Sequence, residues 1–347
     1  MPEKIHLVLS GGAVLGIAHA GVLCALDDEG IEVDTICGTS AGALVGSLYA
    51  AGYKGSEIQR IVAEKRLDKI LLDSRIILGI AHLRVLMPLI WPKRIKILSG
   101  LVFLVLVLLI ILSWIYLSIR FDPFYFIKFL TVLFLTVWAM ITILIFTWKP
   151  ALFKGNRLSN WIDKSIKEKL NLVRQPTCSD LPKRFRAVAT DLKASEMIYL
   201  DKDFDNTLTV GQMVRASSAI PFVFAPLQVG KRLLADGGIT QNVPVGAAEE
   251  LAESKGDIFI TVSFVPKSIE PRNTNWFYQL LFATIEAARS VQADTISKDY
   301  THIPIELSVD LDPFDFSVSQ CKKEAAMRMA HSESLNVLQA YKSVLGK

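Results

Sequence analysis

The sequence predicts an α/β fold with a mainly parallel central sheet, interrupted by a two-helix transmembrane hairpin. Strand-like and helix-like segments alternate at the amino terminus, which is typical of a parallel sheet covered by helices. The pentapeptide Gly38-Thr39-Ser40-Ala41-Gly42 stands where the second such strand passes into a helix. Two long uncharged runs lie in the middle of the chain. A chain of 347 residues can hold one large α/β domain with an insertion of this size.

Composition excludes several classes of protein. Hydrophobic residues make up 51% of the chain, charged residues 21%, and the mean hydropathy is +0.38, which excludes a disordered, collagen-like or coiled-coil protein. The net charge of +4 is too small for a nucleic-acid-binding protein, although it suits a protein near anionic lipid. The four cysteines form no C-x-x-C pair, so we expect them to be reduced packing residues that bind no zinc. No metal or organic cofactor is expected.

The first fifty residues alternate between strand and helix patterns. Residues 5–9 form a short apolar run that predicts a strand, and residues 16–29 predict a helix that ends at Gly30. A second strand is predicted near residues 33–37. It is followed by a small-residue helix that ends at Gly52. This order predicts the first two strands and helices of a parallel sheet.

The central part of the chain predicts a membrane hairpin over residues 92–149. Residues 97–119 and 129–148 are uncharged, and each run has about the 20 residues that a bilayer-crossing helix needs. Basic residues are more frequent in the flanks than in the short connection, so we expect an integral membrane protein with both termini on the cytoplasmic side. Residues 73–91 are apolar but interrupted by charges, which predicts either an interfacial helix or a core helix.

The remaining segments complete one discontinuous domain, which we expect to comprise residues 1–72 and 150–310. Residues 185–190 and 258–264 predict buried strands. Thr209 and Gln212 have the spacing of a capping box that opens a helix ending before Pro221. We expect residues 311–347 to form a helical segment packed on this domain.

The Gly-x-Ser-x-Gly turn makes Ser40 a candidate nucleophile. Flanking glycines let the chain bend sharply from strand to helix, which leaves the serine hydroxyl accessible. The following helix places the positive end of its dipole nearby. The alternative is a structural turn in which Ser40 only caps that helix.

A nucleophilic serine also needs hydrogen-bond donors for the developing oxyanion. The segment from Ser10 to Gly16 lies between the first strand and the first helix, where the amides of small residues can converge on an anion. The same segment approximates a dinucleotide-binding loop, with Gly11, Ala13 and Gly16 near the glycine positions. An alanine at the second position would crowd a pyrophosphate, which disfavours nucleotide binding.

The base of such a site has several candidates. Asp236 ends an apolar run and precedes two glycines, although such a sequence is also a common turn. Asp191, at another strand end, competes with it. A Ser-Asp-His triad would use His302 or His331, but Ser40 comes early in the chain for that fold, and both histidines fit structural positions.

Four segments resemble the patatin-like phospholipase family. LVLSGGAVLGIAHAGVLCAL resembles its oxyanion segment, ICGTSAGALVGSLYAAG its nucleophile elbow, LLADGGITQNVPV its aspartate loop, and VRASSAIPFVFAP the block before that aspartate. The resemblance covers residues 5–55 and 155–265, and VDLDPFDFSVSQC near the carboxyl terminus is more weakly similar. It implies a three-layer α/β fold and a Ser-Asp dyad.

The resemblance also implies the roles of individual residues. Ser40 is implied as the nucleophile and Asp236 as its base, with no need for a histidine. The implied oxyanion hole is formed by the amides of Gly11, Gly12 and Ala13. The glycines that support these motifs are Gly16, Gly38, Gly42, Gly237 and Gly238.

The implied activity is that of a membrane-anchored serine acyl hydrolase. It would cleave carboxylic esters of phospholipids or lysophospholipids through an acyl-enzyme on Ser40, with membrane lipid as its partner and no nucleic acid. This chain has Ala13 and Leu15 where the family usually has a third glycine and a basic residue. That departure leaves a weakly active or inactive lipid-binding scaffold as the alternative.

Overall fold

The fold is described for seven stretches of the chain. The computed structural model describes residues 3–64, 131–138, 153–205, 207–221, 223–265, 300–313 and 315–344. The chain divides into two units, one formed by Met1–Ser74 with Phe153–Lys347 and the other by Arg75–Leu152. All the candidate site residues belong to the first unit.

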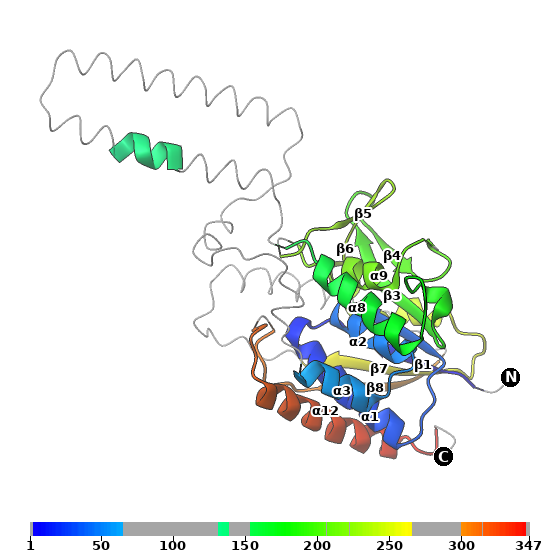
Figure 1. The fold of residues 1–347 in the computed structure, drawn as a ribbon. Coiled ribbons are helices and arrows are strands. Elements are labelled where there is room, and N and C mark those ends of the chain that lie inside the picture. Colours follow the sequence, from blue (N-terminus) through cyan, green and yellow to red (C-terminus); the bar gives the residue numbers. More distant parts are fainter. Residues whose placement is uncertain are drawn as a thin grey trace, which may run out of the picture. The chain divides into compact units, whose positions relative to one another are not determined.

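A mixed β-sheet forms the centre of the first unit (Figure 1). Its strands are β1 (Ile5–Leu9), β2 (Thr35–Thr39), β3 (Arg184–Asp191), β4 (Glu196–Leu200), β5 (Leu227–Val229), β6 (Arg232–Asp236), β7 (Ile258–Phe264) and β8 (Thr301–Leu307). In the described residues the order is β5-β6-β3-β2-β1-β7-β8, and β4 pairs with β3. The neighbours from β3 to β8 in this order run parallel, whereas β4, β5 and β6 make antiparallel pairs.

The predicted α/β fold is confirmed, but the sheet is mixed. The departure has a local cause, because short turns connect β3 to β4 and β5 to β6. A short connection can only join antiparallel neighbours, whereas parallel neighbours need a longer crossover such as the helix between β1 and β2. The parallel part holds the first two predicted strands.

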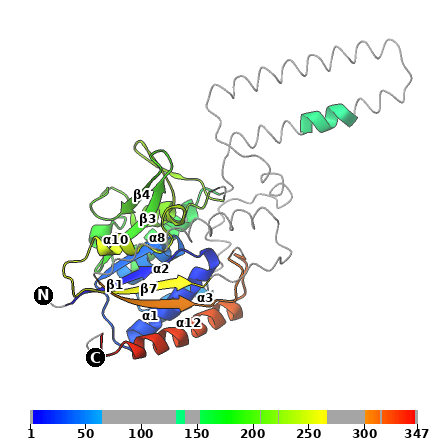
Figure 2. The same ribbon diagram turned by 180° about the vertical axis from the view of Figure 1, so that it is seen from behind.

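Helices cover both faces of the sheet. One face packs against α1 (His19–Asp28), α2 (Ala41–Ala50), α9 (Val210–Ser217) and α12 (Gln320–Ala340), with α3 (Gly55–Glu64) and α8 (Asn156–Lys169) against those helices. The other face packs against α10 (Val245–Glu249). This helix is labelled in Figure 2, which shows the molecule from behind. The strands support both layers because successive side chains alternate, so Leu7 and Leu9 join the larger core and Val8 joins the smaller one.

Two local predictions describe the helices well. Thr209 and Gln212 form the expected capping box, in which the Gln212 amide donates to Thr209 Oγ1 and the Thr209 amide donates to Gln212 Oε1. The carboxyl-terminal helix α12 packs closely on α1, because a Cβ on Gly21 would lie 2.1 Å from the Met327 carbonyl oxygen.

The predicted transmembrane hairpin is not supported. The runs 97–119 and 129–148 lie outside the described residues except for 131–138, which are helical and mostly exposed. Among the described residues no helix has both the length and the apolar character that crossing a membrane requires. The predicted localisation, a two-span membrane protein with both termini on the cytoplasmic side, is therefore wrong. The predicted interfacial or core helix, residues 73–91, lies outside the described residues.

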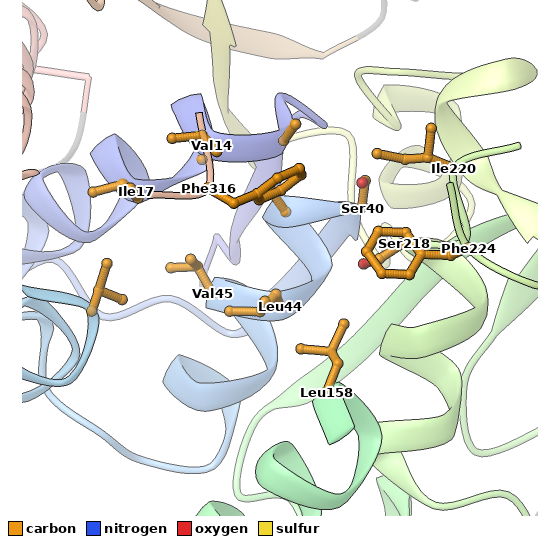
Figure 3. Close-up of a pocket in the computed structure, with 14 residues that line it drawn as sticks. Val14, Ile17, Ser40, Leu44, Val45, Leu158, Ser218, Ile220, Phe224 and Phe316 are labelled. Atoms are coloured by element: carbon orange, nitrogen blue, oxygen red, sulfur yellow. The ribbon is translucent and has the colours of Figure 1, made fainter. Parts of the chain in front are cut away.

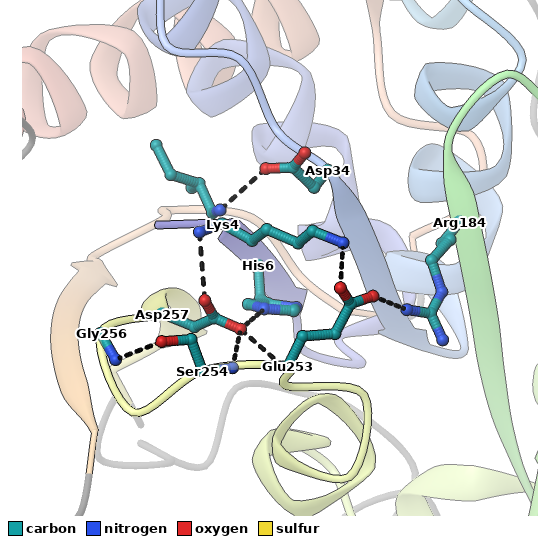
Figure 4. Close-up of polar contacts among 9 residues, drawn as sticks. Lys4, His6, Asp34, Arg184, Glu253, Ser254, Gly256 and Asp257 are labelled. Atoms are coloured by element: carbon teal, nitrogen blue, oxygen red, sulfur yellow. Dashed lines mark hydrogen bonds and ion pairs between the residues drawn. The ribbon is translucent and has the colours of Figure 1, made fainter. Parts of the chain in front are cut away.

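A buried polar network holds the amino ends of β1 and β7 together (Figure 4). His6 Nε2 lies 3.2 Å from Asp257 Oδ2, and the carboxylate of Asp257 also accepts the amides of Lys4, Glu253 and Ser254. Burial lowers the pKa of His6. Because this network occupies the amino edge of the parallel strands, the opposite edge is available for the candidate site.

Candidate active site

Ser40 occupies a strained turn between β2 and α2. Its backbone has φ +52° and ψ −116°, a conformation that a non-glycine residue adopts only when its surroundings enforce it. The two flanking glycines permit the turn, because a Cβ on Gly42 would lie 2.2 Å from the Leu9 carbonyl oxygen and one on Gly38 would lie 2.6 Å from the Ala43 nitrogen. The Ser40 side chain makes no capping hydrogen bond to α2, which argues against the purely structural interpretation of the turn.

Ser217, the last residue of α9, holds this turn. The Ser40 amide donates to Ser217 Oγ at 2.9 Å, and the Ser217 hydroxyl donates to the Val188 carbonyl of β3 at 2.5 Å. Both serines are buried. One hydroxyl therefore connects the nucleophile candidate to the neighbouring strand.

Strand register brings Asp236 to the same edge as Ser40. Thr39 of β2 pairs with Val188 of β3, and the next residue of β3, Ala189, pairs with Asp236 of β6. Two strand spacings separate β2 from β6, which is about 10 Å between backbones. Because β6 pairs only with the last residues of β3, it ends level with the carboxyl end of β2 although it runs antiparallel.

The loop after Asp236 folds back onto the Ser40 turn. Thr39 Oγ1 donates to the Gln241 carbonyl at 3.0 Å. A Cβ on Gly237 would lie 2.3 Å from the Val188 carbonyl oxygen and 3.2 Å from the Thr39 methyl. Within the loop, the Gly238 amide donates to Asp236 Oδ1 at 2.7 Å. The Asp236 side chain is 6% exposed, so its carboxylate belongs to a largely buried site.

The loop after β1 supplies backbone amides beside Ser40. The Gly11 amide donates to the Asn242 carbonyl at 3.0 Å, so it serves to join this loop to the aspartate loop. The amides of Gly12 and Ala13 have no hydrogen-bond partner among the described residues, and Ala13 has φ +50°. Gly16, in the 3-10 helix η1 (Ala13–Ala18), packs against α2, since its Cβ would lie 2.3 Å from that of Ala41.

His19 and Phe264 support this loop from behind. His19 Nε2 lies 2.9 Å from the Ser10 carbonyl oxygen, and burial lowers the pKa of His19 to about 4, so the neutral imidazole donates there. The Phe264 ring lies 4.9 Å from the His19 ring and fills the space that a Cβ on Gly12 would need. The loop is therefore held by packing, by the buried hydrogen bond from His19 and by backbone hydrogen bonds such as that of Gly11.

An apolar pocket opens beside Ser40 (Figure 3). It contains about 590 Å³ of space, counting the part open to solvent. Among its described lining residues only Ser40 and Ser218 carry polar side chains. The lining residues are Ala13, Val14, Gly16, Ile17, Ser40, Ala41, Leu44, Val45, Val62, Leu158, Ser218, Ile220, Phe224 and Phe316. This lining suits a hydrocarbon chain.

The competing base candidates lie elsewhere. His302 pairs with Phe259 near the amino end of β7, and its Nε2 lies 3.3 Å from Glu249 Oε1, whereas Ser40 lies beyond the carboxyl end of β2. His331 on α12 bonds Asp28. Asp191 accepts the amides of Lys193 and Leu233 in a turn, and the Lys193 amide lowers its pKa. In the described ranges no group of His, Cys, Asp or Glu side chains is arranged to hold a metal ion.

Several residues of this site carried no recognisable role in the sequence. Ser217, Ser218, His19, Phe264 and Phe316 act through contacts between distant segments. The available signals were the quoted segments that contain them, such as VRASSAIPFVFAP, which contains both serines but does not distinguish them.

The sequence of this chain is similar to a known protein family and to several known proteins. The family model of patatin-like phospholipase matches residues 7–249. The uncharacterized protein YqhO of Bacillus subtilis is 26% identical over 93% of this chain and 94% of its own length. Lysophospholipase NTE1 of Scheffersomyces stipitis is 55% identical over 51 residues, which are 15% of this chain and 3% of that protein.

A solved structure has the same fold. The crystal structure of VipD from Legionella pneumophila has a TM-score of 0.52 and 19% identity, covering 98% of this chain and 67% of that chain. At this level of identity the likeness concerns the fold, which is a patatin-like α/β fold with a mixed sheet. Since the family model spans more than half of the sequence, the chain belongs to the patatin-like phospholipase family and is a lipid hydrolase.

Proposed function

We propose that this protein hydrolyses carboxylic esters of phospholipids or lysophospholipids with a Ser40–Asp236 dyad. The observation that carries the proposal is the Ser40 turn, whose strained backbone places a hydroxyl that caps no helix at an apolar pocket. Asp236 stands on the neighbouring loop, which is joined to that turn through Thr39 and Gln241. A relative named lysophospholipase shares a segment of 51 residues with this chain, which supports the lipid class.

The first half of the reaction forms an acyl-enzyme. Ser40 Oγ attacks the ester carbon while Asp236 accepts the hydroxyl proton. The amides of Gly12 and Ala13 stabilise the charge on the carbonyl oxygen, since the Gly11 amide is already bonded to Asn242. The bond to the alcohol oxygen then breaks, and that oxygen takes the proton from Asp236.

The second half releases the fatty acid. A water molecule attacks the acyl carbon and gives its proton to Asp236. The bond to Ser40 Oγ breaks, and the proton returns to that oxygen. The apolar pocket beside Ser40 holds the acyl chain during both halves.

The test uses lysophospholipid hydrolysis and a fluorophosphonate probe. Ser40→Ala and Asp236→Asn are expected to lower kcat by about 10⁴-fold, because residues of one catalytic unit cannot replace each other. The probe should label the wild-type protein and fail on Ser40→Ala. His331→Ala serves as the control. Because His331 is hydrogen-bonded to Asp28 and not to the proposed dyad, this variant should keep its activity within about twofold of the wild type. Full activity of either dyad variant would refute the proposal.

The scaffold alternative gives a different result in the same experiment. Leu15, which stands where the family usually has a basic residue, packs against the hydrophobic core. If the wild-type protein is only a scaffold, it would be folded, but the fluorophosphonate probe would not label it. Labelling at Ser40 rules that alternative out.

A further inference from the structure

Two adjacent serines at the end of α9 have different environments. The Ser217 hydroxyl accepts the Ser40 amide and donates to the Val188 carbonyl. The Ser218 hydroxyl oxygen is buried and makes no hydrogen bond with any residue that the structure describes. Ser218 therefore has a polar group for which this part of the chain provides no partner.

The position of Ser218 indicates where a partner would come from. Ser218 lines the same pocket as Ser40, and every other described lining residue is apolar or glycine. Figure 3 shows the Ser40 and Ser218 side chains near one another in the pocket. Ala13, whose amide has no partner among the described residues, lines the same pocket, so a ligand beside Ser40 is within a pocket that also contains these two donors.

A buried hydroxyl without a partner is unfavourable. A ligand in the pocket that supplies an acceptor would remove the desolvation cost of this hydroxyl. An ester offers two acceptors, the carbonyl oxygen and the alkoxy oxygen. In the proposed reaction the amides of Gly12 and Ala13 serve the carbonyl oxygen, which leaves the alkoxy oxygen for another donor.

We infer that the Ser218 hydroxyl donates a hydrogen bond to the alkoxy oxygen of the bound ester. This inference rests on the proposed function, because it takes the ester to be attacked by Ser40. The bond orients the leaving group and favours esters whose link atom is a good acceptor. Ser218 is then a residue that selects the kind of acyl link, while Ser217 keeps the turn in place.

The test compares two single-chain lysophospholipid analogues that differ only in an oxygen or a sulfur at the acyl link. Sulfur is a weak acceptor, so the thioester gains little from this hydrogen bond. Ser218→Ala is expected to lower kcat/KM for the oxygen ester about tenfold and for the thioester less than about twofold. Ser218→Thr keeps a hydroxyl and should retain the wild-type ratio of the two substrates. Because the ratio is measured on one preparation, partial unfolding cancels.

A matched control is available on α12. Ser334 is also buried with an unpartnered hydroxyl, but it lies outside the described pocket lining. Ser334→Ala should leave both substrates unchanged. An equal loss for both substrates in Ser218→Ala, or no loss, would overturn the inference. If the wild-type protein is not labelled by the fluorophosphonate probe, the proposed function itself fails, which is a separate outcome.

Discussion

Replacing Ser217 with alanine tests whether the strained turn depends on one hydroxyl. The substitution removes the acceptor of the Ser40 amide and the donor to the Val188 carbonyl, both of them buried. Ser40 keeps φ +52° only while its surroundings enforce it, so the loss of this hydroxyl should also relax the turn.

The expected magnitude follows from the two groups left without this partner. A buried donor or acceptor that loses its hydrogen bond costs about 1–3 kcal/mol, so the loss of both should lower the free energy of unfolding of Ser217→Ala by about 2–6 kcal/mol. Ser218→Ala is the matched control, because it removes a hydroxyl of the same size that makes no hydrogen bond with the described residues. Since that hydroxyl is already unsatisfied, its removal should leave the free energy of unfolding unchanged or raise it.

Urea unfolding followed by circular dichroism measures both effects on the full chain. The comparison requires equal slopes for the variants, so that a shift in midpoint reports stability. Equal destabilisation by the two alanine substitutions, or a loss below about 0.5 kcal/mol for Ser217→Ala, would contradict the roles assigned to these serines.

Three further predictions concern packing, protonation and thiol reactivity. Gly42→Ala places a Cβ 2.2 Å from the Leu9 carbonyl oxygen and should lower the free energy of unfolding, measured by thermal unfolding, by about 1–3 kcal/mol. In Gly246→Ala the nearest atom to the new Cβ lies 3.5 Å away, so this variant should be as stable as the wild type or more stable. Burial lowers the pKa of His19 from 6.5 to about 4, so between these values the unfolded chain binds a proton that the folded chain does not. The free energy of unfolding should therefore fall as the pH is lowered through this window, by up to about 3 kcal/mol, and His19→Gln should flatten that dependence in urea titrations. Cys321 is exposed and the other three cysteines are buried with raised pKa values, so Ellman's reagent should modify one thiol rapidly in the native protein and all four in urea; more than one rapid reaction would contradict the packing.

Local rules explain why much of the site could be predicted. The glycines around Ser40 and the capping box at Thr209 depend on sterics and hydrogen bonds within a few residues. A pattern of this kind has few solutions, which is why the strand, turn and helix near Ser40 follow the prediction. The dyad and the Gly12 and Ala13 amides stay predictions that the activity assays test.

The membrane prediction was wrong for a different reason. A count of consecutive apolar residues measures hydrophobicity, whereas a span also requires one continuous helix of about 20 residues. Among the described residues no helix is both long enough and apolar enough to cross a membrane. Hydrophobic length alone was therefore insufficient to assign a location.

By itself, the sequence determined the alternation of strands and helices, the sharp turn at Ser40 and the family to which the chain belongs, because each depends on residues close together in the chain. Only the tertiary structure decided which polar groups find partners. The Gly11 amide is hydrogen-bonded to Asn242, and the Ser217 hydroxyl is hydrogen-bonded to Val188. The Ser218 hydroxyl lines the pocket and has no hydrogen-bond partner among the described residues. These outcomes depend on strand register and on contacts between segments about 30 to 230 residues apart, and no local pattern encodes them.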